Sequence, residues 1–586
     1  MSSIRRFSSQ ARSFPLRDDR ASEGSLPTPA PSLYGVAADD FGRQPPVDAH
    51  GLVVRDRPAP LPEGPATTAA ALTAGVRDHP DREALVHGDP RDGGQALTYA
   101  ELDARVAAAA GGLTALGIRP GDRVACSLPN RVALVEAFLA TQRLGAVWLG
   151  INTNLTADEV AWTLDDSEVN LLVTTDNRAE SLRGPAPDRR ATDRHLLVVD
   201  PTNGSGSWAD LVDAGHPAPT INVDPQAPAA IAYTSGTTGR PKGAVHSQHN
   251  LLWPGISSRR SYPSVPGERH GTALALTILN MLVLGPLWAY LRGTTAVLVE
   301  RTDAVGFAAE VRTQRINRVT LVPALAHDLV AHPDVHRDDL ATLTQTIIGA
   351  GHSPPVLRDA WEAKFGTRAI VGYGLTEAPT GVTREHVNRP MRPDGAGYPL
   401  EPVRVVIVDE EDQPLPDGDT GEICLTPVTH GPWAGVWTPM LGYLGQPDAT
   451  AEALRGGVLH TGDLGFLDEH GQLVIRGRRT EMILRGGANV YPAEVERVVL
   501  DHPGVREVAV LGLVDDRLGE VVAAGLVAEP GPWADGDPDL LVNDVRSFCQ
   551  ERLARYKVPD QILVLDRFPR NTMGKVIKGD LAPAFE

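Results

Sequence analysis

Cysteine is scarce in this chain, which has three cysteines among 586 residues. Cys126, Cys424 and Cys549 each lie in an apolar stretch, and none has a second Cys or a His beside it at the spacing of metal ligands. This pattern argues against a disulfide scaffold and against a zinc finger. We expect three small core residues in a reducing compartment, and therefore a cytoplasmic protein.

Basic residues are fewer than acidic ones: 55 Lys+Arg against 74 Asp+Glu give a formal charge of −19. Such a field repels polyanions at long range, so the charge argues against a nucleic-acid partner. A single nucleotide is still allowed. The backbone N–H groups of a short loop and one lysine can hold a phosphate whatever the global charge.

The N-terminus lacks the apolar segment of a secretory signal. Residues 1–65 are rich in Pro, Ser and Gly without periodicity, and we predict a disordered leader there. Residues 1–17 contain four arginines, several serines and no acid. That composition also suits an organelle transit peptide, and the sequence leaves this alternative open.

Long uncharged runs are equally rare. Residues 272–291 contain no charged side chain over about 20 positions, which is long enough to cross a bilayer. Asn280, Gly285 and Pro286 interrupt the run, so we predict a buried helix and turn rather than a membrane span.

Hydrophobic residues make up 42% of the chain and charged residues 22%, which is typical of a globular protein. From residue 94 to about 299, amphipathic helices alternate with short apolar runs. Residues 98–116 place apolar side chains at helical spacing, and 124–128 form a strand pattern. This alternation, continued at 319–329 and 346–371, predicts βαβ units and a mostly parallel sheet.

The pattern changes twice towards the C-terminus. After about residue 402, short strands such as 403–408 and 421–425 indicate a smaller β subdomain. Past Arg478 we predict a helix that starts at Pro492, strands at 508–514, 521–527 and 562–565, and another helix. That last helix places Val542, Val545, Cys549, Leu553 and Tyr556 on one stripe. The prediction is an α/β protein with a large N-terminal domain (66–478) and a small mobile α+β domain (479–586).

The strongest local motif is the glycine- and hydroxyl-rich loop at 233–243, directly after the apolar run 229–232. Its glycines let backbone N–H groups point inward, and Lys242 adds a cation, which together suit a polyphosphate. It is not a Walker A loop, because Pro241 stands where the second glycine must be. Composition alone leaves an ordinary turn open.

Five further motifs follow in order along the chain. They are Tyr-Gly-Leu-Thr-Glu at 373–377, Thr-Gly-Asp at 461–463, Gly-Arg at 477–478, a glycine motif at 485–496 and Pro-Arg-x-x-x-Gly-Lys at 569–575. Together with the loop at 233–243, this set resembles the adenylate-forming superfamily. That superfamily includes acyl-CoA synthetases, adenylation domains of nonribosomal peptide synthetases and beetle luciferases. The resemblance covers about residue 94 to the C-terminus.

The resemblance implies a role for each motif. The ATP phosphates would be held by Thr376 and by Thr234, Ser235, Gly236, Thr237, Thr238, Gly239 and Lys242. Glu377 would bind Mg²⁺, and Asp463 with Arg478 would bind the ribose. Adenine would lie on Gly349, Ala350 and Gly351, with Tyr373 and Gly374 on the opposite side. Lys575 would bridge the acyl carboxylate and the phosphate, and Gly486 and Gly487 would line a tunnel for the CoA pantetheine.

Residue chemistry fits these roles. A carboxylate is a poor electrophile, and its attack on the α-phosphorus of ATP gives an acyl-AMP with a good leaving group. Two anions approach each other in this step, so positive charge from Mg²⁺ and lysine is the main requirement. The hinge between the domains would lie at Thr480, where the family usually has Asp or Lys.

An acyl pocket is expected after residue 272. By alignment of the apolar run we assign to it Asn280 and Met281, with Val322, His352 and Ser353 as further walls. Each of these could equally be a structural residue. Asn280 hints at a functionalised or small acid rather than a plain long acyl chain.

The leading hypothesis is an ATP- and Mg²⁺-dependent acid:CoA ligase acting on a small-molecule carboxylic acid. A second hypothesis sends the acyl group to a carrier-protein phosphopantetheine, supplied in trans, or to a nitrogen nucleophile. A third is a non-catalytic nucleotide-binding protein, against which the presence of Glu377, Asp463, Arg478 and Lys575 argues. No sequence feature favours an oxygenase of the luciferase kind.

Overall fold

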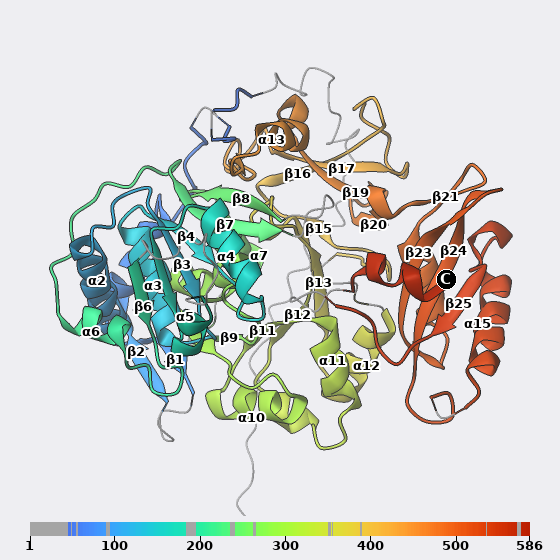
Figure 1. Ribbon diagram of the computed structural model, residues 1–586, viewed down its shortest axis with the longest axis horizontal. Helices are drawn as coiled ribbons and strands as arrows, with labels where there is room; N and C mark the ends of the chain where they lie inside the picture. Colours follow the sequence, from blue (N-terminus) through green and yellow to red (C-terminus); the bar gives the residue numbers. More distant parts are fainter. Residues whose placement is uncertain are drawn as a thin grey trace, which may run out of the picture.

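The structure is a computed structural model of the chain (Figure 1). It describes residues 45–48, 50–53, 57–88, 94–182, 195–234, 241–261, 265, 267–349, 353, 355–386, 389–534, 536–570 and 576–585. The described residues form four sheets with helices packed against them, so the predicted α/β class is confirmed.

The first sheet has seven strands in the order β18-β8-β7-β4-β3-β5-β6. The five strands from β7 to β6 in this order run parallel, as the alternation of helices and strands predicts. β8 returns antiparallel to β7, so the glycine-rich loop joins the two strands of a hairpin. The bounds are β3 (Arg123–Ser127), β4 (Val147–Gly150), β5 (Leu171–Thr174), β6 (His195–Val198), β7 (Pro228–Thr234), β8 (Lys242–Ser247) and β18 (Gly442–Tyr443), with helices α2 (Tyr99–Ala115), α3 (Val132–Arg143), α4 (Ala157–Asp166), α5 (Asp176–Leu182) and α6 (Ser207–Asp213).

The second sheet has nine strands in the order β15-β14-β13-β12-β11-β9-β10-β1-β2. Its central strands, from β13 to β1, are parallel, so their carboxyl ends lie at one edge. The strands are β1 (Glu83–His87), β2 (Gln95–Thr98), β9 (Arg269–Thr272), β10 (Thr295–Leu298), β11 (Arg318–Leu321), β12 (Gln345–Ile348), β13 (Ala369–Tyr373), β14 (Thr383–Arg384) and β15 (Tyr398–Pro399). The helices of this region are α1 (Thr73–Asp78), α7 (Trp253–Ser261), α8 (Leu279–Leu282), the π-helical turn η5 (Val283–Leu287), α9 (Trp288–Arg292), α10 (Ala304–Gln314), α11 (Pro323–Ala331) and α12 (Pro355–Phe365).

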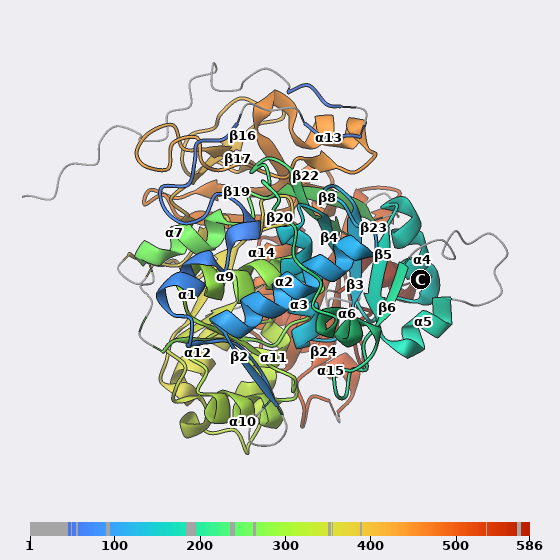
Figure 2. The ribbon, with the colours of Figure 1, turned by 90° about the vertical axis from the view of Figure 1, so that its left-hand side faces the viewer.

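One hydrophobic core joins the two large sheets. It contains Trp148 of β4, Leu85 of β1, Val106 of α2, Leu134 of α3 and Leu291 of α9. Figure 2 shows α2 and α3 side by side on this flank of the molecule. The core therefore fixes the two sheets, and the edges where their strands end, relative to each other.

Local sequence explains where α2 begins. The Thr98 hydroxyl accepts a hydrogen bond from the Glu101 N–H at 3.2 Å, and the Glu101 carboxylate accepts one from the Thr98 N–H at 2.8 Å. This capping box satisfies two donors that the first helical turn leaves unpaired. The predicted apolar stripe of this helix is buried, as expected for a core-facing helix.

The third sheet is antiparallel, in the order β16-β17-β19-β20, and lies at the top of Figures 1 and 2. Its strands are β16 (Val403–Val408), β17 (Gly421–Pro427), β19 (Leu459–Leu467) and β20 (Leu473–Arg478), with α13 (Pro447–Ala453) beside them. It corresponds to the β subdomain that the sequence predicts. β18 comes from the same stretch of chain but pairs with β8 at the edge of the first sheet.

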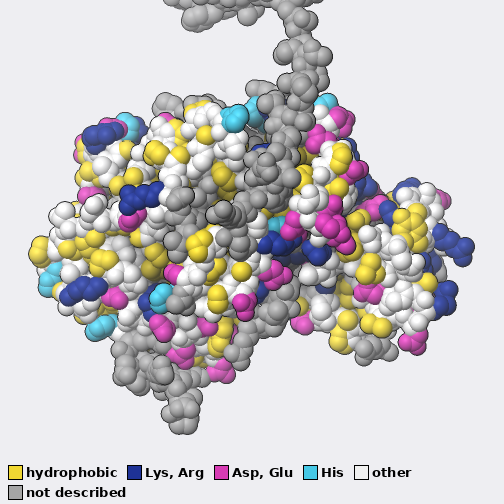
Figure 3. Space-filling model, turned by 90° about the horizontal axis from the view of Figure 1, so that it is seen from above, with side chains coloured by type: hydrophobic (Ala, Val, Ile, Leu, Met, Phe, Trp, Pro, Cys, Tyr) yellow, Lys and Arg dark blue, Asp and Glu magenta, His cyan; other side chains and the backbone are white. Residues whose placement is uncertain are grey.

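The fourth sheet, at the right of Figure 1, is built from residues after Arg478. Its strand order is β22-β21-β24-β23, and β25 pairs with β24. The bounds are β21 (Ile483–Arg485), β22 (Ala488–Val490), β23 (Val505–Asp515), β24 (Gly519–Ala528), β25 (Gln561–Val564), α14 (Pro492–Leu500) and α15 (Pro538–Arg552). Basic and acidic side chains lie side by side where this unit meets the body (Figure 3).

The structure corrects the predicted extent of the last helix. α15 ends at Arg552, so Leu553 and Tyr556 are not part of it. Leu553 is extended, and residues 555–557 form a 3-10 turn in which the Lys557 ammonium lies 2.7 Å from the Glu494 carboxylate. This ion pair holds residues 555–557 close to α14. The apolar stripe of α15 itself is buried through Leu541, Val545 and Cys549.

Part of the stretch predicted to be a disordered leader packs against the body. The Val53 N–H donates to the Leu441 carbonyl at 2.7 Å, and Leu52 forms a bridge with Gly442 of β18. Thr450 of α13 donates its hydroxyl to the Gly51 carbonyl at 2.8 Å. For residues 50–53 the structure thus differs from the prediction, because these backbone groups extend the edge of the first sheet beyond β18. Residues 1–44 lie outside the described residues.

The uncharged run at 272–291 folds into the end of β9, α8, η5 and α9, and most of it is buried in the body. Among the described residues, no helix has both the length and the apolar character needed to cross a bilayer. The interruption at Gly285 and Pro286 coincides with the π-helical turn.

Candidate nucleotide and acyl-activation site

The predicted phosphate loop connects β7 to β8, and the structure describes only its two ends. Thr234 and Lys242 are cross-strand partners, with the Thr234 hydroxyl 3.4 Å from the Lys242 carbonyl. Ser235, Gly236, Thr237, Thr238 and Gly239 lie outside the described residues. The Lys242 ammonium stands over the ring of Tyr443, 5.2 Å from its centre.

The same tyrosine holds Glu377. The Tyr443 hydroxyl donates to Glu377 Oε1 at 2.8 Å, and the Met440 N–H donates to the Glu377 carbonyl at 2.8 Å. Burial, reinforced by the Glu377 carboxylate, raises the pKa of Tyr443, so its hydroxyl stays protonated and keeps donating. The β18 segment therefore brings the predicted phosphate-binding lysine and the predicted metal ligand together.

Thr376 and Glu377 lie in a tight turn after β13. A Cβ added at Gly374 would collide with the Thr380 carbonyl oxygen, so the turn needs glycine at this position. Thr380 itself has φ = 82°, a left-handed conformation that is rare for a β-branched residue. Strain of this kind persists where the surrounding structure enforces it, often at functional sites.

Asp463 is the centre of a second polar group. It lies on β19 opposite Arg478 of β20, and the Arg478 Nε is 3.1 Å from Asp463 Oδ1. The Tyr373 hydroxyl, at the end of β13, donates to Asp463 Oδ2. Both oxygens of this buried carboxylate are thus oriented by neighbours from two different sheets.

The two partners of Asp463 keep their protons. Burial, with the Asp463 charge beside it, raises the pKa of Tyr373, which therefore remains a donor. Burial alone would lower the pKa of the Arg478 guanidinium, but the charges of Asp463 and its neighbours outweigh burial and raise it. The predicted ribose pair is therefore a preformed ion pair.

Gly349 lies directly after β12, where its N–H donates to the Leu321 carbonyl at 3.0 Å. A Cβ added there would meet nothing within 4 Å, so this position borders open space. Ala350, Gly351 and His352, which complete the predicted adenine and acyl-pocket segment, lie outside the described residues. The Ser353 hydroxyl is buried and has no hydrogen-bond partner among the described residues.

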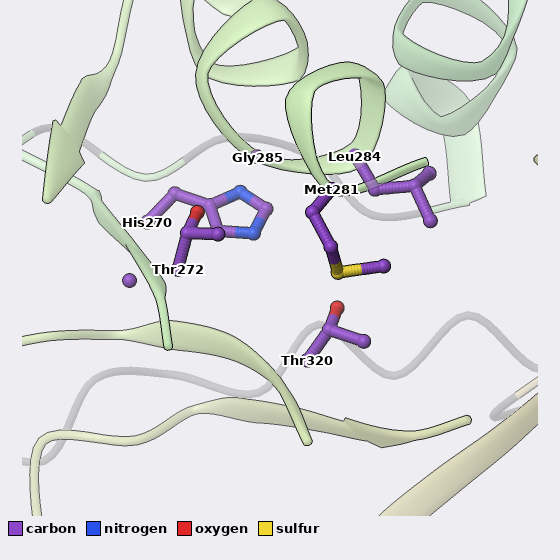
Figure 4. A pocket seen from close by; sticks show the side chains of 7 residues that line it. His270, Thr272, Met281, Leu284, Gly285 and Thr320 are labelled. Carbon is purple, nitrogen blue, oxygen red and sulfur yellow. The ribbon is translucent and has the colours of Figure 1, made fainter. Parts of the chain in front are cut away.

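Of the predicted acyl-pocket residues, one lines a cavity in the body. Met281 of α8 borders a small cavity above β9 and β11 (Figure 4). Asn280, its partly buried neighbour on α8, and Val322, which caps α11, are not among the residues that line this cavity.

Gly486 and Gly487 form the two-residue turn between β21 and β22, with φ angles of 58° and 83°. Two successive left-handed residues are the requirement of a type I′ hairpin turn, which explains glycine at both positions. The Arg485 guanidinium makes two hydrogen bonds to Asp560, at 3.0 and 2.5 Å, and fixes the base of the turn. The predicted pantetheine-tunnel residues therefore lie at an exposed hairpin tip.

Lys575 lies outside the described residues, together with Asn571 to Gly574. The chain on either side is described: Arg570 forms a β-bridge with Val576, and the Ile577 N–H donates to the Pro569 carbonyl at 2.9 Å. The two ends of the lysine loop therefore meet, and Lys575 immediately precedes the bridge.

Sequence reasoning missed a buried polar cluster on the third sheet. Ligand atoms of Glu422, Cys424 and His460 lie within 4.8 Å of one another. No sequence spacing indicates this, because the residues come from β17 and β19 and meet only through strand pairing. Arg455 and Arg479 approach the Glu422 carboxylate at 3.1 and 3.4 Å. They supply the positive charge that a metal ion would bring, so the geometry favours an ion-pair network over a metal centre.

Comparisons with known proteins agree with this geometry. Residues 72–439 match the family described as AMP-binding enzyme, and residues 494–575 match the AMP-binding enzyme C-terminal domain. The chain belongs to the AMP-binding enzyme family. The resemblance to adenylate-forming enzymes is thereby confirmed, and this AMP-binding enzyme is a ligase of the acyl-CoA synthetase type.

Among its relatives is a feruloyl-CoA synthase of Amycolatopsis sp., 36% identical over 84% of this chain and 95% of that protein. A fatty acid–[acyl-carrier-protein] ligase, ScoC, of Streptomyces coeruleorubidus is 33% identical over 84% of this chain and 92% of its own. The crystal structure of ATP-bound MatB from Rhodopseudomonas palustris is 29% identical, with a TM-score of 0.79. The match covers 89% of this chain and 99% of that one.

Proposed function

We propose that this AMP-binding enzyme is an ATP-dependent acid:CoA ligase. It would convert a carboxylic acid and ATP to acyl-AMP and pyrophosphate, and then pass the acyl group to the thiol of CoA with release of AMP. The observation that carries the proposal is the pair of oriented carboxylates, Asp463 held by Tyr373 and Glu377 held by Tyr443. Tyr373 and Glu377 flank one turn at the end of β13, so both carboxylates belong to one site.

In this proposal Asp463 accepts the ribose hydroxyls, and Arg478 keeps the carboxylate charged and in place. Gly349, Ala350 and Gly351 admit the flat adenine, with Tyr373 and Gly374 on the other side. The open space at the Cα of Gly349 supports this assignment. Thr376, Lys242 and residues 234–239 contact the phosphates.

Glu377, with the hydroxyl of Thr376, fits a Mg²⁺ ligand set. Both offer oxygen atoms, which are the ligands that Mg²⁺ takes in proteins. Tyr443 bonds Oε1, and within the described residues Oε2 makes no hydrogen bond. A bound Mg²⁺ supplies positive charge to the phosphate oxygens.

The acid carboxylate attacks the α-phosphorus, and the bond to the β-phosphate oxygen breaks to release pyrophosphate. Lys242 would neutralise charge on the pyrophosphate side, and Lys575 would bridge the acid carboxylate and the α-phosphate. Positive charge aimed where negative charge develops is the largest contribution that such a site can make. In the second step the thiolate attacks the acyl carbonyl, and AMP leaves.

Thiol transfer would use the small domain differently. We propose that residues 479–586 turn about Thr480, so that Gly486 and Gly487 then line the pantetheine tunnel. The exposed position of this hairpin supports its use as a movable wall. We place the enzyme in the cytoplasm, a proposal supported by its three buried free cysteines.

A pyrophosphate-release screen over a panel of acids, with and without CoA, tests this proposal. Acid-dependent release that CoA accelerates, with an acyl-CoA of the correct mass, is the expected result. Chelation of Mg²⁺ should stop release. Absence of release with every acid would contradict an adenylating function and favour non-catalytic nucleotide binding.

A carrier-protein acceptor is the second candidate, and the similarity to ScoC favours it. A nitrogen nucleophile is a variant of the same idea. Acid-dependent pyrophosphate release without any acyl-CoA, followed by acylation of an added holo carrier protein, would select this candidate over CoA.

A further inference from the structure

A small cavity lies between the nine-stranded sheet and the helices α8 and η5, and most of its lining surface is apolar. Its volume is about 10 Å³, which is room for about one water-sized group. It is lined by His270, Gly271 and Thr272 of β9, Met281 of α8, Leu284 and Gly285 of η5, and Thr320 of β11. In Figure 4, His270 and Thr272 lie together on one side, and Met281 reaches towards the Thr320 hydroxyl.

Two buried polar atoms belong to residues that line this cavity. His270 Nδ1 and Thr272 Oγ1 are buried and lack a hydrogen bond within the described part of the chain. The two residues are only 6% and 5% exposed. Each buried unsatisfied atom costs about 1–3 kcal/mol, so a folded protein rarely keeps two side by side without a ligand or a water between them.

The residues that line the cavity carry no charge. Burial, together with the nearby charges of Arg318, Arg292 and Arg384, lowers the pKa of His270 to about 3, so its ring is neutral at neutral pH. Arg318 is paired with Glu268 at 2.7 Å, and no charged side chain is among the residues that line the cavity. The nearby arginines are not among the lining residues, so a carboxylate placed here would have no ion-pair partner at the cavity wall, whereas a hydroxyl needs none.

The cavity lies on the way to the proposed activation site. Strand register puts Thr272, Thr320 and Ile347 on one face of the sheet, and Gly349 follows Ile347 by two residues. At about 3.3 Å per residue, the register position of Thr272 and Thr320 is therefore roughly 7 Å from Gly349 along the strand direction. Thr320 and Ile347, on this face, are only partly buried.

We propose that the cavity is the far end of the acyl pocket and that His270 and Thr272 select an acid with a neutral hydroxyl remote from its carboxyl group. This inference rests on the proposed function, and it adds the substrate class. The hydroxyl would donate to one of the two atoms and accept from the other. Thr320 would offer a third polar contact, and a hydrocarbon end would leave His270 Nδ1 and Thr272 Oγ1 without a partner among the described residues.

The helix above the cavity is built around this hydroxyl-sized space. A Cβ added at Gly285 would collide with Thr272 Oγ1, so only glycine leaves the threonine in place. Gly285 and Leu284 both belong to the π-helical turn. A π-helical turn contains one extra residue, and this changes which side chains of the helix face β9.

The test measures kcat/KM for acyl-AMP formation with matched acids: 4-hydroxycinnamate against cinnamate, and 8-hydroxyoctanoate against octanoate. For at least one pair, the wild type should prefer the hydroxy acid by about tenfold or more. Thr272→Val and His270→Phe should each reduce this preference several-fold. Thr346→Val is the matched control, because its hydroxyl is also buried and unpartnered among the described residues but lies on the opposite face of the sheet.

Binding of the same acids is measured by calorimetry, so that the cavity is tested even without turnover. Hydroxyl-dependent binding that Thr272→Val abolishes, without pyrophosphate release, would support the cavity assignment and overturn the proposed function. The inference is overturned if the wild type binds and uses both members of each pair equally. It is also overturned if Thr272→Val and Thr346→Val act alike, or if 4-carboxycinnamate is preferred. In those cases the cavity holds only a structural water or a charged group.

Discussion

At the scale of single residues, two phenol hydroxyls orient the two carboxylates on which the proposed chemistry depends. Tyr373 donates to Asp463, and Tyr443 donates to Glu377. Each tyrosine lies far from its acid along the chain, on β13 for Asp463 of β19 and on β18 for Glu377 of the turn after β13, so the fold itself orients both carboxylates. Preorganised charge of this kind needs no rearrangement during the reaction, which is why it lowers the barrier.

Tyr443→Phe removes the hydroxyl that holds Glu377 and keeps the ring beneath Lys242. We expect acyl-AMP formation to fall by about tenfold or more, mainly through a higher KM for Mg²⁺·ATP, because Glu377 is no longer oriented. Thioester formation from supplied acyl-AMP should change little. Pyrophosphate release titrated with Mg²⁺, and a separate thioester assay, measure the two effects.

Tyr99→Phe serves as the control for that substitution. The Tyr99 hydroxyl is also buried, and it donates to the Thr294 carbonyl at 2.7 Å, outside the proposed active site. It should lower stability without changing the KM for Mg²⁺·ATP. Similar kinetic effects of both substitutions would argue that Tyr443 acts through stability alone.

The sequence predicts Glu377, Asp463 and Arg478 as site residues because each stands in a recognisable motif. The structure brings Asp463 and Arg478 into contact, as adjacent antiparallel strands require. Tyr443 could not be predicted in the same way. A Gly-Tyr pair carries no chemical signal of its own, and Tyr443 lies 66 residues from Glu377 along the chain.

At the scale of elements, the paired strands β17 and β19 carry a charge network to the start of the small domain. Glu422 of β17 lies close to His460 of β19, to Arg455 and to Arg479, which directly precedes Thr480. Its second oxygen accepts from the Gly462 N–H at 3.1 Å, next to Asp463. The network therefore ties the predicted hinge to the strand that carries the ribose carboxylate.

This network should make stability depend on acid pH. Burial alone would raise the pKa of Glu422, but the hydrogen bond and charge of His460 and the charge of Arg455 lower it from 4.5 to about 2. A lowered folded-state pKa contributes stability above the unfolded value, which is lost as pH falls from about 4.5 towards 2. The contribution is about 3 kcal/mol.

Glu422→Gln removes that titration. We expect urea unfolding of the variant to show a smaller loss of stability between about pH 6 and about pH 3 than the wild type shows. Glu411→Gln, in the exposed turn before β17, is the control and should follow the wild-type curve. Parallel curves for wild type and Glu422→Gln would contradict the assignment.

The helices and strands differ in how accurately the sequence predicts their bounds. Alternating apolar and polar segments predict β3, α2, β11 and α14 within a few residues, because burial and period determine them. The end of α15 differs from the prediction, because apolar residues continue at helical spacing past Arg552. No local motif marks the turn that follows, which is held by the ion pair of Lys557 with Glu494. The π-helical turn η5 and the two-residue strand β18 depend on distant partners, which no local pattern reports.

At the scale of the whole molecule, two units must cooperate. The large body carries Asp463, Glu377 and Lys242, whereas the predicted catalytic lysine belongs to the chain after Arg478. Domain class and order could be predicted from the motifs, because each motif stands in sequence order. The relative placement of the two units could not be predicted, because the sequence between Arg478 and Ile483 does not indicate the angle between them.

Lys575→Ala separates the two half-reactions. We expect acyl-AMP formation to fall by at least about 100-fold, because a positive charge is lost where the acid meets the α-phosphate. Thioester formation from supplied acyl-AMP should stay within about twofold, since the lysine would have no role in that step. Single-turnover assays of each step provide the comparison, and an equal loss in both would refute a role confined to adenylation.

One contact near the start of the described chain bears on how this enzyme can be shortened. Thr450 donates its hydroxyl to the Gly51 carbonyl and accepts from the Tyr443 N–H at 2.8 Å, and Tyr443 in turn holds Glu377. Residues 50–53 precede the segment that matches the family, which begins at 72. A recombinant form that begins at residue 72 would therefore keep every motif and still lose the Gly51 carbonyl that holds Thr450, and through it Tyr443, in place behind the proposed metal ligand.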